Sequence, residues 1–152
     1  MTLVTDTQLQ GGLDEAIDDA EEQLSVLFGR VRIIMKDAAV QIHPDLRPVG
    51  YKILAAIVRL GETNGNHLAD LLETDKSVVS RQVRMLEDAG LVTSRADDKD
   101  GRARVLTPTP EAVERLRSVR SAQQKRLREL LATQSERDVR AFADMLRLIG
   151  QG

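Results

Sequence analysis

Two short β-prone runs on either side of a charge-dense turn constrain the fold of this chain more than any other feature. The runs cover residues 90–95 and 103–107, and the polar turn between them contains one glycine, Gly101. Two such runs joined by a turn predict a β-hairpin, here with a longer loop than the tight two-residue type. Three basic residues lie at its expected tip: Lys99, Arg102 and Arg104. A thin, exposed, arginine-bearing hairpin that follows a helix has the shape of a nucleic-acid-binding wing.

Helices predicted before the hairpin complete a winged helix-turn-helix. Residues 48–60 carry apolar side chains at helical spacing. Asn64 is a suitable N-cap for a short second helix. Asp75 is a suitable N-cap for a third helix over residues 76–89, and Gly90 is suited to end it.

The helix predicted over residues 76–89 has two different faces. At about 100° per residue, Val79, Val83 and Leu86 share one stripe and should face the core. The opposite stripe exposes Ser77, Ser80, Arg81 and Arg84. Arginine can read guanine in the major groove, serine can bond bases or phosphates, and the free N–H groups near Lys76 suit a phosphate. A solvated amphipathic helix has the same pattern, but the hairpin that follows favours a recognition helix.

A long heptad pattern begins near the N-terminus. Its apolar positions alternate steps of four and three residues: Leu13, Ile17, Ala20, Leu24, Leu27, Val31, Ile34 and Ala38. A helix over this span is about 39 Å long, which is too long to be buried within one small domain. A partner helix from the same chain or from a second copy is therefore implied. An amphipathic helix packed on its own domain explains this segment equally well.

We therefore expect a mainly α fold with a small β-hairpin wing, a winged helix-turn-helix joined to a helical dimerisation region from both termini. The expected parts are a frayed or disordered segment 1–11, a dimerisation helix within 12–46, a DNA-binding region 47–110 and C-terminal dimerisation helices within 111–152. The first of the C-terminal helices should start with Thr109 as N-cap and Pro110 at its first position.

The charge of the chain is unevenly distributed. The net charge of −2 and the pI of about 5.7 count against a simple basic nucleic-acid binder. Residues 1–24 carry seven acidic side chains and no Lys or Arg, whereas residues 76–104 carry seven basic side chains against five acidic ones. The acidic N-terminal part therefore masks a locally basic middle.

Several classes of protein are excluded or disfavoured. The absence of cysteine excludes disulfides, thiolate metal ligands and reactive thiols. No apolar run approaches the roughly 20 residues that span a bilayer, and no signal-peptide pattern opens the chain. We therefore expect a soluble, cytoplasmic protein without a membrane partner. His43 and His67 are the only histidines and lack metal-binding spacing, so we expect no catalytic residues, no metal site and no cofactor.

The segment that contains these helices and the hairpin resembles the multiple antibiotic resistance regulator (MarR) family. The helix-turn-helix resemblance rests on Leu68-Ala69, Val79-Ser80-Arg81, Leu86-Glu87 and Gly90-Leu91-Val92 at their spacing. Residues 100–107 match the wing signature of the family, an Asp-x-Arg followed by a Leu-Thr. Together these motifs cover residues 64–110, while the terminal helices match in placement rather than in motif. Pro110 is a departure, because the family often has Gly there.

The resemblance implies a homodimeric transcriptional regulator that binds a pseudo-palindromic site in double-stranded DNA. By position, Ser77, Val78, Ser80 and Arg81 would lie in the major groove, on the helix that also exposes Lys76 and Arg84. Arg102 would enter the adjacent minor groove, whose negative potential attracts arginine, and Asp100 would hold its guanidinium. Lys99 and Arg104 would contact phosphates.

The resemblance also implies a ligand-responsive repressor, although the sequence leaves repression and activation open. Family members often release DNA when a small aromatic or anionic effector enters a cleft beside the dimerisation helices. Arg30, His43 and Tyr51 are candidates to line such a cleft, but ordinary roles in the surface, a turn and the core are simpler interpretations. The acidic net charge favours an alternative function, a winged-helix module that binds protein and not DNA.

Overall fold

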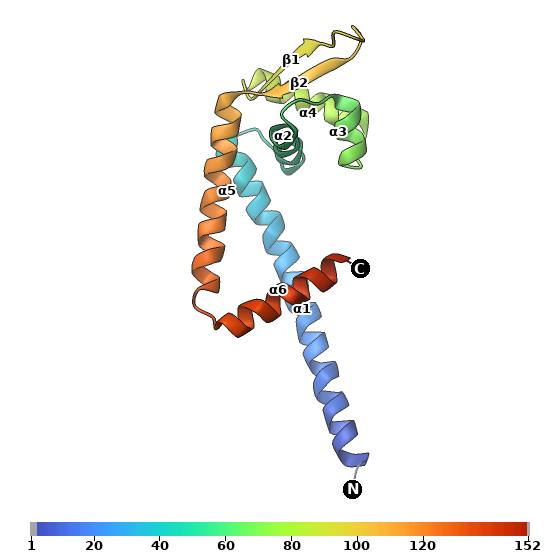
Figure 1. Ribbon diagram of the computed structural model, residues 1–152, viewed down its shortest axis with the longest axis vertical. Coiled ribbons are helices and arrows are strands. Elements are labelled where there is room, and N and C mark those ends of the chain that lie inside the picture. The colour runs from blue at the N-terminus through green and yellow to red at the C-terminus, as the bar shows by residue number, and fades with distance from the viewer. Residues whose placement is uncertain (1–2, 152) are drawn as a thin grey trace. The chain divides into compact units, whose positions relative to one another are not determined.

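The protein is mainly helical, and its two strands form one hairpin. The structure, a computed structural model, describes residues 3–151. In chain order the elements are α1 (Leu3–Ile42), α2 (Pro48–Leu60), α3 (Gly65–Leu71), α4 (Lys76–Asp88), β1 (Val92–Ala96), β2 (Arg104–Pro108), α5 (Pro110–Leu131) and α6 (Glu136–Gln151) (Figure 1). The chain separates into two compact units, one within the first 52 residues and one from residue 53 onward. The predicted fold class is confirmed.

The N-terminal helix starts earlier than expected. We expected a frayed or disordered segment over residues 1–11, but residues 3–11 form the first turns of α1; residues 1 and 2 lie outside the described part of the chain. Each residue added to an existing helix forms one more hydrogen bond, and this stretch contains no proline that would stop the helix. Gly11 and Gly12 cost only about 1 kcal/mol each relative to alanine, which does not end the helix.

Capping signals in the sequence set the ends of α3 and α4. The Asn64 side chain accepts a hydrogen bond from the backbone N–H of His67 at 2.9 Å, as an N-cap does. Asp75 holds the N-cap position of α4, but its side chain makes no capping hydrogen bond. Gly90 follows α4 with a φ of +72°, a left-handed conformation that glycine adopts without steric cost.

A paired C-terminal cap directs the chain from α4 into the hairpin. The Leu91 N–H donates to the Leu86 carbonyl and the Gly90 N–H donates to the Glu87 carbonyl, both at 2.9 Å. This is the Schellman pattern, which satisfies carbonyl groups that the end of a helix leaves free. Because Leu91 and Val92 are buried, the same turn also anchors the start of β1 in the core.

The two strands pair antiparallel from Val92↔Pro108 to Ala96↔Arg104. The loop between them covers residues 97–103. At the middle of β2, Leu106 also forms a separate antiparallel bridge with Thr63, with backbone N···O distances of 3.1 and 2.8 Å. The connection between α2 and α3 therefore pairs one residue with the free edge of β2, and this pairing joins the hairpin to the helix-turn-helix.

The core of the second unit is aliphatic. Its fully buried large side chains come from α2, α3, α4, the turn before β1, and α5: Ile53, Leu54, Ile57, Leu68, Val79, Leu86, Leu91 and Leu116. Thr109 caps α5 by accepting from the Ala112 N–H at 3.2 Å, and Pro110 opens the helix, as predicted. None of the helices that the structure describes combines the length and apolarity needed to cross a membrane.

Candidate nucleic-acid interface

The two faces of α4 lie as the sequence predicts. Val79, Val83 and Leu86 are buried, and α4 packs beside α3 and β1. The predicted polar stripe is exposed to solvent: Lys76, Ser77, Ser80, Arg81 and Arg84. Val78 differs from this stripe, because it is half-buried and lines a hollow between α3 and α4 together with Ala69 and Glu73. Its contact with DNA stays a prediction.

A groove of about 630 Å³ lies between α4 and the hairpin. Val79, Val83 and Leu106 contribute its apolar lining. Five of the residues predicted for DNA binding meet in it: Lys76, Ser80, Arg84, Arg102 and Arg104. The remaining predicted residues, among them Ser77, Arg81 and Lys99, lie outside this groove. The concentration of four cations in one hollow gives the surface a strong local attraction for phosphate.

Three polar residues of the groove were not predicted. Asn64 and Asn66 enter it from the start of α3, and Glu87 enters it from the last turn of α4. Asn64 was identified only as a helix cap. Glu87 belongs to the family motif quoted above, but nothing in that motif indicates that its carboxylate faces the basic groove.

Arg104 is exposed, but its guanidinium makes hydrogen bonds within the protein. Its Nε donates a hydrogen bond to Ser94 Oγ at 3.0 Å, and its Nη2 donates to Ser94 Oγ and, at 3.3 Å, to the Ser94 carbonyl oxygen. We expected a phosphate contact for this side chain. The structure places it diagonally across the two strands, where the hydroxyl and carbonyl of Ser94 meet its donors.

Asp100 bonds the backbone of the hairpin loop in the absence of DNA, and its role in holding the Arg102 guanidinium on DNA stays a prediction. Its Oδ1 accepts a hydrogen bond from the backbone N–H of Arg102 at 3.1 Å, whereas no ion pair joins it to the Arg102 guanidinium in the described chain. Asp97 makes the equivalent bond to the Lys99 N–H at 2.8 Å. The reason is reach, because the short aspartate side chain bonds a backbone group two residues ahead more readily than a guanidinium. Both carboxylates shape the loop.

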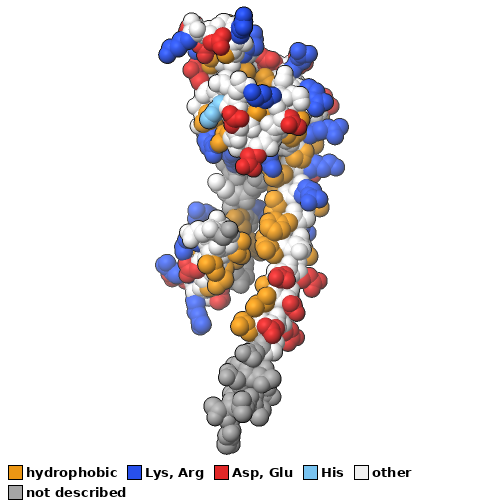
Figure 2. Space-filling view, turned by 90° about the vertical axis from the view of Figure 1, so that its right-hand side faces the viewer, with side chains coloured by type: hydrophobic (Ala, Val, Ile, Leu, Met, Phe, Trp, Pro, Cys, Tyr) orange, Lys and Arg blue, Asp and Glu red, His pale blue; other side chains and the backbone are white. Residues whose placement is uncertain are grey.

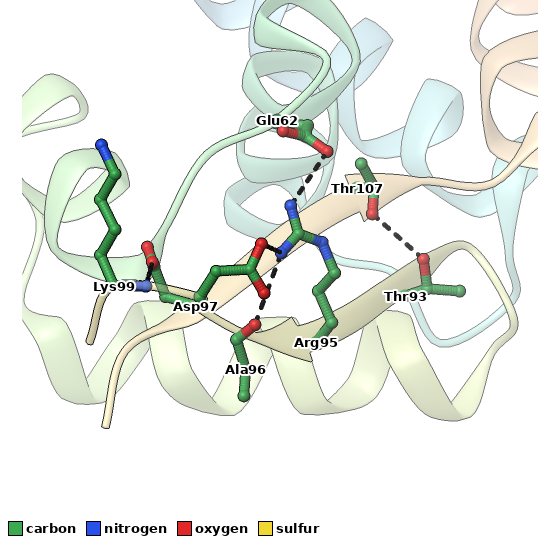
Figure 3. Close-up of polar contacts among 8 residues, drawn as sticks. Glu62, Thr93, Arg95, Ala96, Asp97, Lys99 and Thr107 are labelled. Atoms are coloured by element: carbon green, nitrogen blue, oxygen red, sulfur yellow. Dashed lines mark hydrogen bonds and ion pairs between the residues drawn. The ribbon is translucent and has the colours of Figure 1, made fainter. Parts of the chain in front are cut away.

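A further network fixes the outer side of the hairpin. Arg95 extends from β1 to Glu62, with 3.6 Å between nitrogen and oxygen, and lies equally close to Asp98 (Figure 3). The hydroxyls of Thr93 on β1 and Thr107 on β2 lie 3.2 Å apart across the hairpin (Figure 3). Since the side chain of Arg95 is half exposed, each of these ion pairs adds little stability alone. Lys99 remains exposed at the tip.

Two of the three effector candidates are well separated along α1 within one chain, and their role in an effector site stays a prediction. Arg30 is exposed on α1, and His43 lies just beyond the end of that helix, where its Nδ1 accepts from the Asp45 N–H at 3.3 Å. Thirteen residues separate them, which is about 20 Å along a helix. Tyr51 is buried in α2. Within the described residues, no cluster of three or more metal-binding side chains is placed to hold an ion.

Comparison with known proteins agrees with this geometry. A model of the MarR family matches residues 45–103. YdgJ of Bacillus subtilis (strain 168), an uncharacterized HTH-type transcriptional regulator, is 25% identical over 95 residues. The match covers 62% of this chain and 58% of that protein, less than two thirds of its length.

Two solved structures share the fold. YusO from Bacillus subtilis has a TM-score of 0.77 at 20% identity, covering 91% of this chain and 97% of that one. Streptococcus pneumoniae FabT, in complex with DNA, has a TM-score of 0.77 at 16% identity, covering 89% of this chain and 95% of that one. The matched segment contains α2, α3, α4 and the hairpin loop. The segment of residues 45–103, which spans the helix-turn-helix and the first strand and loop of the hairpin, is therefore similar to the MarR family.

Proposed function

We propose that the protein is a sequence-specific transcriptional regulator that binds double-stranded DNA, acting in the cytoplasm as a ligand-responsive repressor. The main observation that supports this proposal is the composition of one groove. Three residues of the polar stripe of α4 and two arginines of the hairpin line the same basic groove: Lys76, Ser80, Arg84, Arg102 and Arg104. The similar fold of FabT, whose structure contains DNA, supports the same function.

The groove suits simultaneous contact with two grooves of a duplex. The width of the major groove admits an α-helix, and Arg81 and Arg84 are exposed on α4 to reach its bases or backbone. Arg102 lies at the exposed end of the hairpin, where the adjacent minor groove would attract its charge. The acidic net charge of the chain does not oppose this, since basic residues outnumber acidic ones by seven to five in the segment 76–104.

A homodimer on a pseudo-palindromic operator completes the proposal. The heptad positions of α1 include large apolar side chains that are exposed to solvent, among them Leu13 at 62% and Ile17 at 46% exposure. On α6, Phe142, Leu146 and Ile149 recur at helical spacing and are all about half exposed. Figure 2 shows hydrophobic side chains exposed at the molecular surface. Soluble proteins rarely leave contiguous apolar faces of this kind uncovered, and a second copy presents the matching faces.

A second groove is the better candidate for an anionic effector. It has a volume of about 790 Å³ and lies between the C-terminal part of α1 and the loop that follows. Ile33, Val40, Leu46, Pro44 and Pro48 supply apolar lining, and Arg32, Lys36 and Arg47 supply positive charge. This combination suits a small aromatic or aliphatic anion. Arg30, His43 and Tyr51 are not among its lining residues.

Ligand binding can be tested by a thermal shift screen with small aromatic and aliphatic carboxylates. A compound that binds the native state raises the unfolding temperature by mass action. The shift should disappear in Lys36→Ala and persist in Arg30→Ala, which serves as the matched control. A shift that needs Arg30 and not Lys36 would assign the effector to the residues predicted from sequence.

The test of DNA binding is a titration of a labelled duplex from the protein's own promoter at several salt concentrations, with a scrambled duplex as control. Binding should prefer the promoter sequence and weaken steeply as salt rises, because bound phosphates release counterions. A module that binds protein and not DNA would leave both duplexes free even at low salt. That outcome would select the alternative function.

A further inference from the structure

Ser94 connects α4 with both strands of the hairpin. Its hydroxyl donates a hydrogen bond to Glu87 Oε1 and accepts two from the guanidinium of Arg104. A serine hydroxyl has one proton to donate and two lone pairs to accept with. The hydrogen-bonding capacity of this half-buried side chain is therefore used within the protein, between an acid on the recognition helix and a base on β2.

The Ser94 cluster (Glu87, Ser94 and Arg104) lies where the two strands end and the hairpin loop begins. Arg104 and Ala96 are the last register pair before the loop of residues 97–103. Ser94 lies two residues before Ala96, on the same face of β1, so Arg104 reaches it diagonally. The cluster thus connects α4 to the residue of β2 that follows the loop carrying Arg102.

The cluster also controls a negative charge in a basic groove. Glu87 lines the groove together with Lys76, Arg84 and Arg102. A carboxylate that turned freely there would repel phosphate and would compete for the cations that face DNA. Its hydrogen bond with Ser94 holds the carboxylate at the strand side, next to the charge of Arg104.

We propose that Ser94 is a positioning residue for DNA binding, which sets the spacing between α4 and the hairpin through Glu87 and Arg104. Arg104 then acts inside the protein and contacts no phosphate, while Arg102 remains available to the duplex. This inference rests on the proposed DNA-binding function.

The test compares three variants of the full chain. Ser94→Ala removes the hydroxyl, and Ser94→Thr keeps it on a residue that favours strands. Thr93→Ala is the matched control, because it removes the neighbouring hydroxyl, which bonds Thr107 instead of the cluster. Binding is measured with the promoter duplex and a scrambled duplex across a salt series. Without DNA, hydrogen exchange is measured at the bonded amides of residues 97, 99, 102 and 103.

Ser94→Ala should accelerate exchange at these amides and weaken promoter binding by about fivefold or more, a typical size for coupling between sites. Its salt dependence should equal that of the wild type, and Ser94→Thr should restore both readouts. Arg104→Ala should behave as Ser94→Ala does. Arg102→Ala should instead lower the slope of the salt dependence by about 1 per protomer, as the loss of a DNA-facing charge does.

The proposal is overturned if Ser94→Ala binds DNA as Thr93→Ala does, if Ser94→Thr restores nothing, or if Arg104→Ala lowers the salt slope as Arg102→Ala does. Failure of the proposed function is a separate result. If the wild-type protein binds neither duplex at low salt, the DNA-binding function fails together with the positioning role. If the wild type binds and Ser94→Ala binds equally well, only the role of Ser94 is lost.

Discussion

The Asp100 carboxylate accepts a hydrogen bond from the backbone N–H of Arg102 at 3.1 Å. The Ala103 N–H in turn donates to the Asp100 carbonyl, and the Asp97 N–H donates to the Ala103 carbonyl, both at 2.9 Å. Asp100 therefore organises the backbone of the tip, and the guanidinium of Arg102 is left to face solvent or a ligand. Asp100 therefore sets the shape of the loop, whereas Arg102 supplies the positive charge that the loop presents.

Exchange of Asp100 for asparagine tests this division of roles. Asn keeps the side-chain acceptor and also favours such turns, and it removes a negative charge from the tip of the hairpin. Asp100→Asn should therefore bind the promoter duplex at least as tightly as the wild type. Asp100→Ala loses the turn bond, worth about 0.5–1.5 kcal/mol, and should bind more weakly. If both variants lose affinity equally, the carboxylate charge is what matters, and the expectation that it orients Arg102 would be supported.

Removal of the Arg102 side chain should affect DNA binding without affecting the fold. The side chain is exposed at the tip, so Arg102→Ala should leave the unfolding temperature and the oligomeric state unchanged. Its affinity for DNA should fall by about tenfold, equivalent to about 1.4 kcal/mol. Fluorescence anisotropy with the promoter duplex measures the affinity, and light scattering provides the control for assembly. Unchanged affinity would remove the hairpin tip from the DNA interface.

Features that depend on neighbouring residues were predictable from sequence. The helix at Pro48–Leu60 has the predicted bounds. Asn64, Gly90 and Thr109 end or begin helices as expected, because capping depends on a few residues nearby. The buried and exposed faces of α4 follow from helical periodicity alone. The hairpin follows from two β-prone runs around a polar turn.

Side-chain partners across elements were not predictable in the same way. The bonds of Arg104 to Ser94 require both the register of the two strands and the diagonal reach between them. The contact of Ser94 with Glu87 further requires the packing of α4 against β1. A single sequence shows that Arg104 is basic and near a turn, and it does not show which hydroxyl or carbonyl lies within reach. For the same reason, Asn66 was missed.

Arg81 should contribute to sequence preference. Its side chain is exposed on the polar stripe of α4 and lies outside the groove beside the hairpin. A good arginine contact with a base contributes about 1–3 kcal/mol of discrimination. Arg81→Ala should therefore reduce the preference for the promoter duplex, so that its affinity falls more than the affinity for a scrambled duplex. A parallel loss on both duplexes, with a smaller salt slope, would instead assign Arg81 to the phosphate backbone.

Thr109 should contribute to stability rather than to binding chemistry. Its hydroxyl oxygen accepts a hydrogen bond from the Ala112 N–H and so caps α5. The hydroxyl group also donates to the Gly90 carbonyl at 2.9 Å, which joins the start of α5 to the end of α4. Loss of an N-cap side chain costs about 0.5–2 kcal/mol. Urea denaturation of Thr109→Ala at fixed protein concentration should show a loss in this range. Ser121→Ala, at an exposed position within α5, is the control and should unfold as the wild type does.

The apolar face of α6 should control assembly. Leu146 shares that face with Val139, Phe142 and Ile149, and α6 has no buried residue among those described. A charge at its centre would be desolvated in a dimer, so Leu146→Glu should shift the protein from dimer to monomer in sedimentation equilibrium. Because a monomer contacts one half-site, affinity for the operator should fall with it. Arg137→Glu also introduces an acid into α6, on the opposite face, and should leave the dimer intact. A dimer that persists in Leu146→Glu would place the subunit interface elsewhere.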